Sequence, residues 1–269
     1  MKQLSSRTSL RNEHTYAVCA YGNSPYLRDC LNSLKSQSIE SNVIICTSTP
    51  SDFINAISYE YDCKLFVNGI ATGIANDWNY AIEKAETPLV TIAHQDDVYS
   101  RDYSERMIAM IDDSLDPLIY FTNYGEIRNG YFNDDSKLLR VKRRLLLPYK
   151  VELCRRRSFL KKRVLSFGNP ICCPSVTYAK EKIPLPLFKE NFKSNLDWEA
   201  WERLSQIDGE FVYDDYIGVY HRVHEGSETS ACIENDIRTN EDKQMFLKFW
   251  PSIIANIING IYRNAQKYN

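Results

Sequence analysis

The chain has 269 residues, 43% of them apolar and 25% charged, with a formal net charge of −2. These values are ordinary for a globular protein with a sizeable core, and nothing in them predicts a nucleic-acid partner. The eight cysteines form no C-x-x-C pair and show no zinc-like spacing, so we expect a reduced, cytoplasmic protein and exclude a secreted disulfide scaffold. The N-terminus lacks the apolar core of a signal peptide, and no apolar run is long enough to predict a transmembrane helix.

The first half of the chain alternates short β-prone runs with segments of helical periodicity. Strands are predicted at residues 15–21, 43–46, 64–68, 89–93 and 118–124. Helices are predicted at residues 25–34, 51–59, 74–85 and 104–113. At the first of these helices, Ser24 is typical of an N-cap and Pro25 of a first helical position. Strands that alternate with helices in this way predict a doubly wound, mainly parallel sheet.

A strongly basic stretch, Lys137–Arg163, follows. It holds twelve Lys and Arg residues against the single acid Glu152, a net charge of +11, so the rest of the chain carries −13. Leucines are interleaved with these charges. One interpretation is a solvated, partly helical face. The other is an amphipathic surface that meets phosphate groups or anionic lipid headgroups.

The remaining chain predicts further strands at 176–179, 212–213 and 217–223, and helices from Asn195 and from residue 235 onward, the latter broken at Pro251. Asp197 falls in the first turn of its helix, where a carboxylate is favoured by the helix dipole, so it can be interpreted as a capping acid. Near the C-terminus an apolar stripe recurs at helical spacing, and we interpret it as core. Its members are Ile253, Ile254, Ile257, Ile258 and Ile261.

Polar residues end the apolar run at 89–93. His94 and Gln95 are followed by two adjacent carboxylates, Asp96 and Asp97. In open α/β sheets the ligand crevice lies outside the carboxyl ends of the strands. Hard carboxylate oxygens at that place suit Mg²⁺ or Mn²⁺ together with substrate phosphates. The alternative is a solvated loop that caps the next helix through Ser100.

Five segments in order resemble the family-2 glycosyltransferases of the GT-A fold. They are Ala20–Asn23 with Tyr26–Leu34, then Asn76–Ala81, Ala93–Tyr99, Leu196–Glu199 and Tyr220–Ser227. The resemblance implies a GT-A (Rossmann-like) α/β fold with a mixed, mainly parallel sheet flanked by helices and with helices at the C-terminus. It also implies a nucleotide-sugar-binding half at residues 1–130, an acceptor and catalytic half at 131–234, and a C-terminal helical extension at 235–269.

The resemblance also implies roles for individual residues. Asp197 matches the segment that supplies the general base. The metal, Mn²⁺ or Mg²⁺, would be held by Asp96, Asp97 and His224. The implied donor-binding residues are Tyr21, Asn23, Asn79, His94, Asp96 and Arg222.

The sequence departs from the family pattern at two places. His94 stands where the family's metal motif has its first acid, as in a bacterial subgroup that has His-Gln-Asp-Asp. The acid that often follows the second strand and reads the base or ribose is missing, and Thr47, Ser48 and Thr49 stand there instead. UDP is the family's commonest donor carrier, but this difference leaves the nucleotide open.

The function we expect is that of a metal-dependent, inverting glycosyltransferase. It would move a sugar from a nucleotide-sugar donor to a hydroxyl of a growing bacterial surface glycan or lipid-linked oligosaccharide, with peripheral membrane contact through Lys137–Arg163. A sugar nucleotidyltransferase is one alternative, but residues 20–24 are not the Gly-rich phosphate loop that such an enzyme normally shows. The other alternative is a non-catalytic GT-A protein that binds a glycan or partner.

Overall fold

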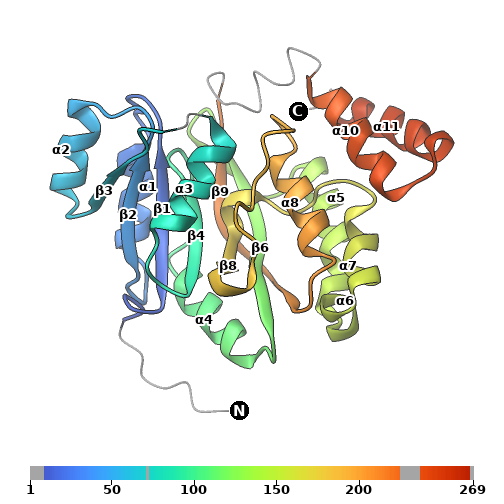
Figure 1. The fold of residues 1–269 in the computed structure, drawn as a ribbon, viewed down its shortest axis with the longest axis horizontal. Helices are drawn as coiled ribbons and strands as arrows, with labels where there is room; N and C mark the ends of the chain where they lie inside the picture. Colours follow the sequence, from blue (N-terminus) through green and yellow to red (C-terminus); the bar gives the residue numbers. More distant parts are fainter. Residues whose placement is uncertain (1–8, 71–72, 225–236, 267–269) are drawn as a thin grey trace.

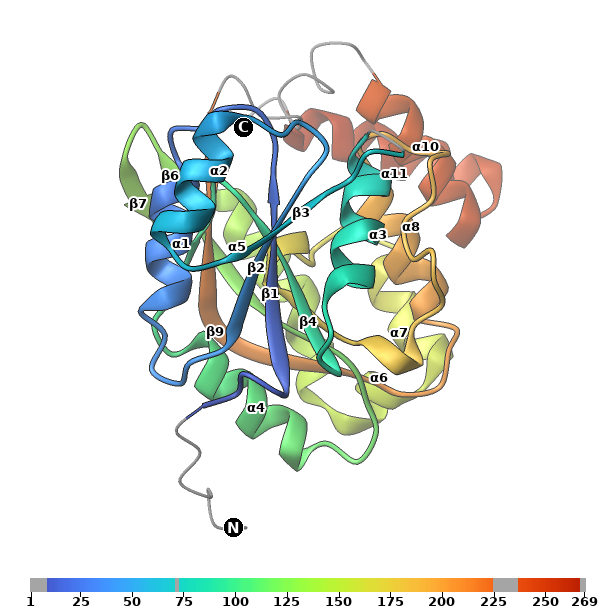
Figure 2. The same ribbon diagram turned by 60° about the vertical axis from the view of Figure 1, so that its left-hand side comes forward.

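A computed structural model describes residues 9–70, 73–224 and 237–266, and shows one mixed sheet with helices on both faces (Figures 1 and 2). The strands lie in the order β3-β2-β1-β4-β8-β6-β9-β5, and β7 pairs with β6. Their bounds are β1 His14–Ala20, β2 Asn42–Thr47, β3 Lys64–Val67, β4 Leu89–His94, β5 Val98–Tyr99, β6 Pro117–Arg128, β7 Tyr131–Asn133, β8 Val176–Ala179 and β9 Glu210–Val223. The GT-A type of α/β fold expected from the sequence is confirmed.

The N-terminal half is the predicted parallel, doubly wound unit. Strands β3, β2, β1 and β4 pair in parallel, and Cys19 at the end of β1 lies opposite His94 at the end of β4. All five residues from Leu89 to Ala93 are buried, as predicted for a strand covered on both faces. The carboxyl ends of β1 and β4 therefore meet at one edge of the sheet, where the polar run His94–Asp97 begins.

Four helices connect the strands of this half: α1 Leu27–Lys35, α2 Asp52–Glu60, α3 Ile74–Lys84 and α4 Tyr103–Asp113. The predicted start of α1 is wrong. The helix begins at Leu27 behind Tyr26, without a side-chain cap, because the Ser24 hydroxyl accepts only the Tyr26 N–H, at 3.3 Å, before the first helical turn. Helix α2 begins close to the predicted position, at Asp52, and the hydroxyl of Ser51 caps it by accepting the Ile54 N–H.

The second half extends the sheet with strands of mixed direction. Strand β8 pairs antiparallel with both β4 and β6, and β6 and β9 pair in parallel. The prediction of two separate strands at 212–213 and 217–223 is wrong, because Glu210–Val223 is one strand whose register against β6 shifts near Asn123. The carboxyl end of β9 thereby reaches the end of β4.

The helices of the second half cover one face of the sheet. The basic segment folds into α5 Lys137–Leu146, α6 Glu152–Arg156 and α7 Ser158–Leu165. The later helices are α8 Leu196–Leu204, α10 Ile237–Phe249 and α11 Ser252–Gln266. Short 3-10 turns lie at Leu147–Lys150, Cys173–Ser175 and Lys180–Lys182. Figure 1 shows α10 and α11 as a hairpin above α7 and beside α8.

Two large apolar clusters flank the sheet. One joins the sheet to α3, α8 and the C-terminal hairpin around Trp198 and Trp201, and the other joins it to α1, α2 and α4 around Tyr16 and Tyr103. The interpretation of the isoleucine stripe near the C-terminus as core is wrong for its outer members. Ile253, Ile257 and Ile261 are exposed, because α11 packs on the domain through Ala255, Ile258 and Tyr262 instead.

Candidate active site

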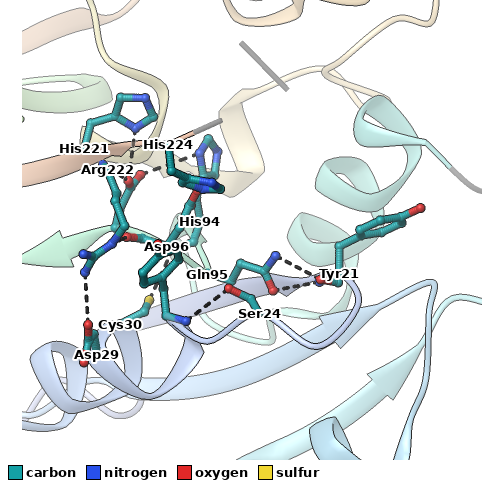
Figure 3. Close-up of polar contacts among 12 residues, drawn as sticks. Tyr21, Ser24, Asp29, Cys30, His94, Gln95, Asp96, His221, Arg222 and His224 are labelled. Carbon is teal, nitrogen blue, oxygen red and sulfur yellow. Dashed lines mark hydrogen bonds and ion pairs between the residues drawn. The ribbon is translucent and has the colours of Figure 1, made fainter. Parts of the chain in front are cut away.

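The adjacent carboxylates at the end of β4 meet the end of β9 (Figure 3). Asp97 is 0% exposed, and its Oδ1 accepts hydrogen bonds from Nδ1 of His221 at 3.0 Å and from the Arg222 N–H at 2.9 Å. Its Oδ2 lies 3.7 Å from Nδ1 of His94 and has no hydrogen-bond partner among the described residues. Asp97 thus joins the ends of two strands that are more than a hundred residues apart in sequence.

Opposite charges stabilise the buried contact between Asp97 and His221. Burial by itself raises the pKa of Asp97, but the attraction of His221 and His94 and the hydrogen bonds outweigh it and leave the pKa below the ordinary value. Burial lowers the pKa of His221, but the carboxylates of Asp97 and Asp96 raise it by more. The pKa of His221 therefore lies above the ordinary value. Each group therefore favours the charged form of the other, the carboxylate of Asp97 and the protonated ring of His221.

Asp96 lies closer to the surface and contacts different groups. Its Oδ2 is 3.0 Å from Nε2 of His224. The Arg222 guanidinium donates to the Asp96 carbonyl at 2.8 Å and to Asp29 Oδ2 at 3.1 Å, and it stacks on the Tyr26 ring at 4.3 Å. Of the segment Tyr220–Ser227 singled out from the sequence, residues 225–227 lie outside the described part of the chain.

Other predicted donor-binding residues line the same edge less directly. The Gln95 side chain accepts from the Tyr21 N–H at 2.9 Å and donates to the Tyr21 carbonyl at 3.0 Å, so it ties the loop after β1 to the acidic loop (Figure 3). The Tyr21 ring is exposed. Asn23 is held farther along this loop, where its Oδ1 accepts from the Ser51 hydroxyl at 2.9 Å.

His94 is stacked on Trp78 of α3, with ring centroids 5.0 Å apart and the planes 17° from parallel. Burial lowers the pKa of His94 and outweighs the opposing effect of Asp97 and Asp96, and its Nε2 has no hydrogen-bond partner in the described chain. Asn79, one residue beyond the tryptophan, does not join the cluster. Its side-chain amide donates to the Phe188 carbonyl and accepts from the Phe188 N–H. Asn79 therefore anchors the loop that contains Phe188.

Asp197 lies in the first turn of α8, as predicted. Its Oδ2 accepts from Nδ2 of Asn169 at 2.7 Å, and its Oδ1 accepts from the Trp198 N–H at 2.7 Å. Burial raises the pKa of Asp197, and these two hydrogen bonds and the charges of Arg238 and Lys142 oppose that rise without reversing it. A partly desolvated, oriented carboxylate of this kind is suited to accept a proton.

Three residues around Asp197 were missed in the sequence. Asn169 comes from the loop after α7, Lys142 from α5 and Arg238 from the first turn of α10. No local pattern marks them, because their charge and hydrogen bonds reach Asp197 only after three separate segments have packed around α8. His221 was noticed as part of a polar cluster but was given no role.

An acid from α3 contacts the loop that follows β2, where the family's acid is missing. Asp77 accepts from the Ser48 hydroxyl at 2.8 Å and from the Asn68 amide at 3.2 Å. Thr49 accepts the Gly22 N–H at 2.7 Å, which connects the loops after β1 and β2. These loops lie at the same sheet edge as the acidic cluster.

The residues at this edge fit a divalent cation in part. Asp96 Oδ2 and His224 Nε2 are adjacent, and Asp97 Oδ2 is a buried oxygen without a hydrogen-bond partner in the described chain. No preformed group of three His, Cys, Asp or Glu side chains with metal-site geometry exists among the described residues. This donor set suits a hard cation that takes one or two protein carboxylates and completes its shell with substrate phosphates.

A protein-family comparison decides the affiliation of the chain. The model for glycosyl transferase family 2 matches residues 15–183, which include β1, the acidic loop and the strands up to β8. The chain belongs to glycosyl transferase family 2. The resemblance stated from the sequence is confirmed, and the protein is a glycosyltransferase. None of the curated proteins compared matches the chain.

Solved structures of similar fold agree with this family-2 assignment. One is S. aureus TarS 1-349 in complex with UDP-GlcNAc, with a TM-score of 0.63 and 17% identity over 92% of this chain and 70% of that one. Another is the mannosyltransferase PcManGT from Pyrobaculum calidifontis in complex with GDP-Man and Mn²⁺, with a TM-score of 0.65 and 14% identity over 92% and 69%. The chain spans 42% of a longer TarS structure, at a TM-score of 0.61 and 15% identity. At these identities the likeness concerns the fold.

Proposed function

We propose that this family-2 enzyme is a metal-dependent, inverting glycosyltransferase that uses a nucleoside-diphosphate sugar, most simply a UDP-sugar, as donor. The observation that carries the proposal is the meeting of Asp96, His224 and Arg222 at one sheet edge. Two oxygen or nitrogen ligands and one cation at that place suit a diphosphate and its metal. TarS was solved with UDP-GlcNAc and PcManGT with GDP-Man and Mn²⁺, which supports this type of donor without fixing the base.

The proposed binding roles follow the geometry. Asp96 and His224 would hold the cation, Mg²⁺ or Mn²⁺, and Asp97 would contribute by fixing His221 and through its Oδ2, which has no hydrogen-bond partner among the described residues. Arg222 pairs with a donor phosphate, with Tyr21, Asn23 and His94 lining the donor side. When bound, the cation stabilises the negative charge that grows on the leaving diphosphate. Asn79 supports this side indirectly, through the Phe188 loop.

In the proposed reaction Asp197 removes the proton from the acceptor hydroxyl. The acceptor oxygen forms a bond to the anomeric carbon while the bond from that carbon to the diphosphate oxygen breaks. Attack from the face opposite the leaving group inverts the anomeric centre. The raised pKa of Asp197 improves its strength as a base, and the hydrogen bond from Asn169 keeps one oxygen oriented.

For the acceptor we propose a hydroxyl of a bacterial surface glycan or lipid-linked oligosaccharide. Residues 1–130 would bind the donor, residues 131–234 the acceptor, and the helices from 235 on would extend that half. The basic segment Lys137–Arg163 would meet anionic lipid at the inner face of the membrane, in keeping with a cytoplasmic enzyme. The seven cysteines that the structure describes are free thiols, which agrees with a reducing compartment.

The test is a panel of UDP-, GDP- and other nucleotide sugars, each with Mn²⁺, Mg²⁺ or a chelator. Slow release of the nucleoside diphosphate that requires the cation and fails in Asp96→Asn supports the transferase. Exchange of pyrophosphate into the nucleotide sugar would instead identify a nucleotidyltransferase. A protein that neither releases nucleotide nor is stabilised thermally by any nucleotide with Mn²⁺ would be a non-catalytic binder.

A further inference from the structure

The C-terminal helix α11 carries apolar residues on two faces. Ala255, Ile258 and Tyr262 pack against the domain. On the outward face Ile253, Ile257 and Ile261 follow at four-residue spacing and are exposed by 75%, 60% and 67%. We call these three residues, with the partly exposed Ile254, the isoleucine row. A contiguous row of exposed aliphatic side chains marks an interaction surface.

The isoleucine row continues into the basic segment. Trp250, two residues before α11, donates its indole N–H to the Ser166 carbonyl, and the Arg163 guanidinium stacks on its ring at 4.0 Å. One turn earlier on α7, the Phe159 side chain is 76% exposed. Figure 1 shows α7 directly below the hairpin. The exposed Phe159 and Arg163 of α7 are therefore connected through Trp250 to the start of α11.

We propose that α11 binds in the interfacial layer of an anionic membrane, with the isoleucine row among the acyl chains and the exposed Arg157 and Arg163, at the two ends of α7, at the lipid phosphates. This rests on the proposed lipid-facing acceptor half and names the element that contacts the bilayer. In the described chain no helix is long and apolar enough to cross a membrane. A helix with one apolar outer face and a neighbouring basic surface is suited to lie in the interface.

A second copy of the chain fits this surface less well. A two-fold dimer places the same patch of both chains together, so Arg163 and its basic neighbours would face their own copies. An anionic lipid surface is complementary to both the charge and the shape of this face.

The inner face of α11 connects this surface to the reaction site. A Cβ atom added at Gly168 would lie 2.7 Å from Cε2 of Tyr262, so the helix closely contacts the loop of Asn169, whose side chain binds Asp197. The element that we place on the membrane therefore also borders the base.

The test is flotation of the full chain with phosphatidylcholine vesicles, with and without phosphatidylglycerol. The wild type should float with the anionic vesicles, and Ile253→Ser, Ile257→Ser and Ile261→Ser together should reduce the bound fraction at least about tenfold. The matched control changes Tyr59, Ile70 and Leu115 to Ser, three side chains exposed by 91%, 97% and 77% away from the hairpin, and should bind normally.

Unfolding by denaturant and release of nucleotide from the donor should be the same in both triple variants, because all six side chains are exposed. Unchanged flotation of the isoleucine variant would overturn the proposal. So would a wild-type dimer in analytical ultracentrifugation that this variant converts to monomer. If flotation behaves as expected but no donor is ever turned over, the membrane face stands and the proposed function fails.

Discussion

Asp96 and Asp97 are neighbours in the chain but lie in different surroundings. Asp97 is buried against His221 and the backbone of Arg222, whereas Asp96 is partly exposed and contacts His224. The single pattern of two adjacent acids therefore contains one buried residue that joins two strands and one partly exposed residue that contacts His224. Their substitution should separate stability from binding.

We expect Asp96→Asn to abolish cation-dependent donor binding and to leave the free energy of unfolding within about 0.5 kcal/mol of wild type. Asp97→Asn should weaken donor binding and also lower the free energy of unfolding by about 1–3 kcal/mol, since it disrupts a buried charge-assisted pair. Calorimetric titration with UDP and Mn²⁺ and urea denaturation measure the two effects. Wild-type binding in both variants would contradict the proposed metal site.

The role of Asp197 can be tested by substitution. If it is the general base, Asp197→Asn should lower transfer by about 10²–10⁴-fold with nearly unchanged donor affinity. A loss of stability without a loss of rate would show that it is only a helix-capping acid.

The neighbouring Asn169 gives a finer test of the same carboxylate. Its hydrogen bond lowers the pKa of Asp197 against the effect of burial. In Asn169→Ala that pKa should rise, and because the base must be ionised, the acid limb of the kcat/KM profile should move to higher pH. An acid limb that stays in place in this variant would separate the titrating group from Asp197.

At the scale of elements, the α10–α11 hairpin supports α8, the helix that carries Asp197. The Glu241 carboxylate of α10 is buried and accepts the backbone N–H groups of Lys193, Ser194 and Asn195 just before α8 begins. Trp198, next to Asp197, packs against three aromatic rings of the hairpin, those of Phe246, Phe249 and Tyr262. The family model ends at residue 183, before both α8 and the hairpin.

Glu241→Gln should therefore affect both stability and turnover. Replacing the charged acceptor weakens three backbone hydrogen bonds, so we expect a loss of about 1–3 kcal/mol in the free energy of unfolding and a lower kcat at an unchanged donor KM. Glu60→Gln on α2 is the control, because Glu60 is an exposed partner of Arg28 and its change should leave both quantities near wild type. If the donor KM rises while kcat is unchanged, the hairpin affects donor binding and the prediction is wrong.

At the scale of the whole molecule, the sequence predicts best what depends on local pattern. The N-terminal strands and helices were recognisable because β1, β2 and β4 are almost fully buried and each helix is buried on one face. Strand β9 was divided in the prediction because Asp214 and Asp215 interrupt its apolar run. Asp214 is nevertheless buried, since Arg106 donates two hydrogen bonds of 2.8 Å to it from 108 residues away.

The same limit applies to the site and to the C-terminal helix. The acidic loop has a local motif, whereas Asn169 and Arg238 acquire their roles only through packing around α8. A helical stripe has the same period whether its face is covered or exposed, so the spacing of the isoleucines could not decide between core and surface. The net charge of −2 is unevenly distributed along the chain, with +11 in Lys137–Arg163 and −13 elsewhere.

That asymmetry predicts how membrane binding responds to salt. Arg140, Arg144 and Arg157 are exposed cations on or beside α5–α7. Each cation near an anionic bilayer contributes about 1 kcal/mol, an effect that added salt screens within a Debye length. Changing the three to Ser should therefore weaken flotation with anionic vesicles strongly at low salt and only slightly at high salt, where wild-type binding is itself reduced.

The control removes the same amount of charge from the other half of the chain. Arg11, Arg28 and Lys64 are exposed cations outside the basic segment, so their change to Ser should leave binding nearly intact. If both triple variants lose binding equally, net charge and not this surface attracts the lipid. If binding ignores salt, lipid charge and both sets of changes, Lys137–Arg163 is a solvated face, and a glycan or protein in solution becomes the acceptor to test.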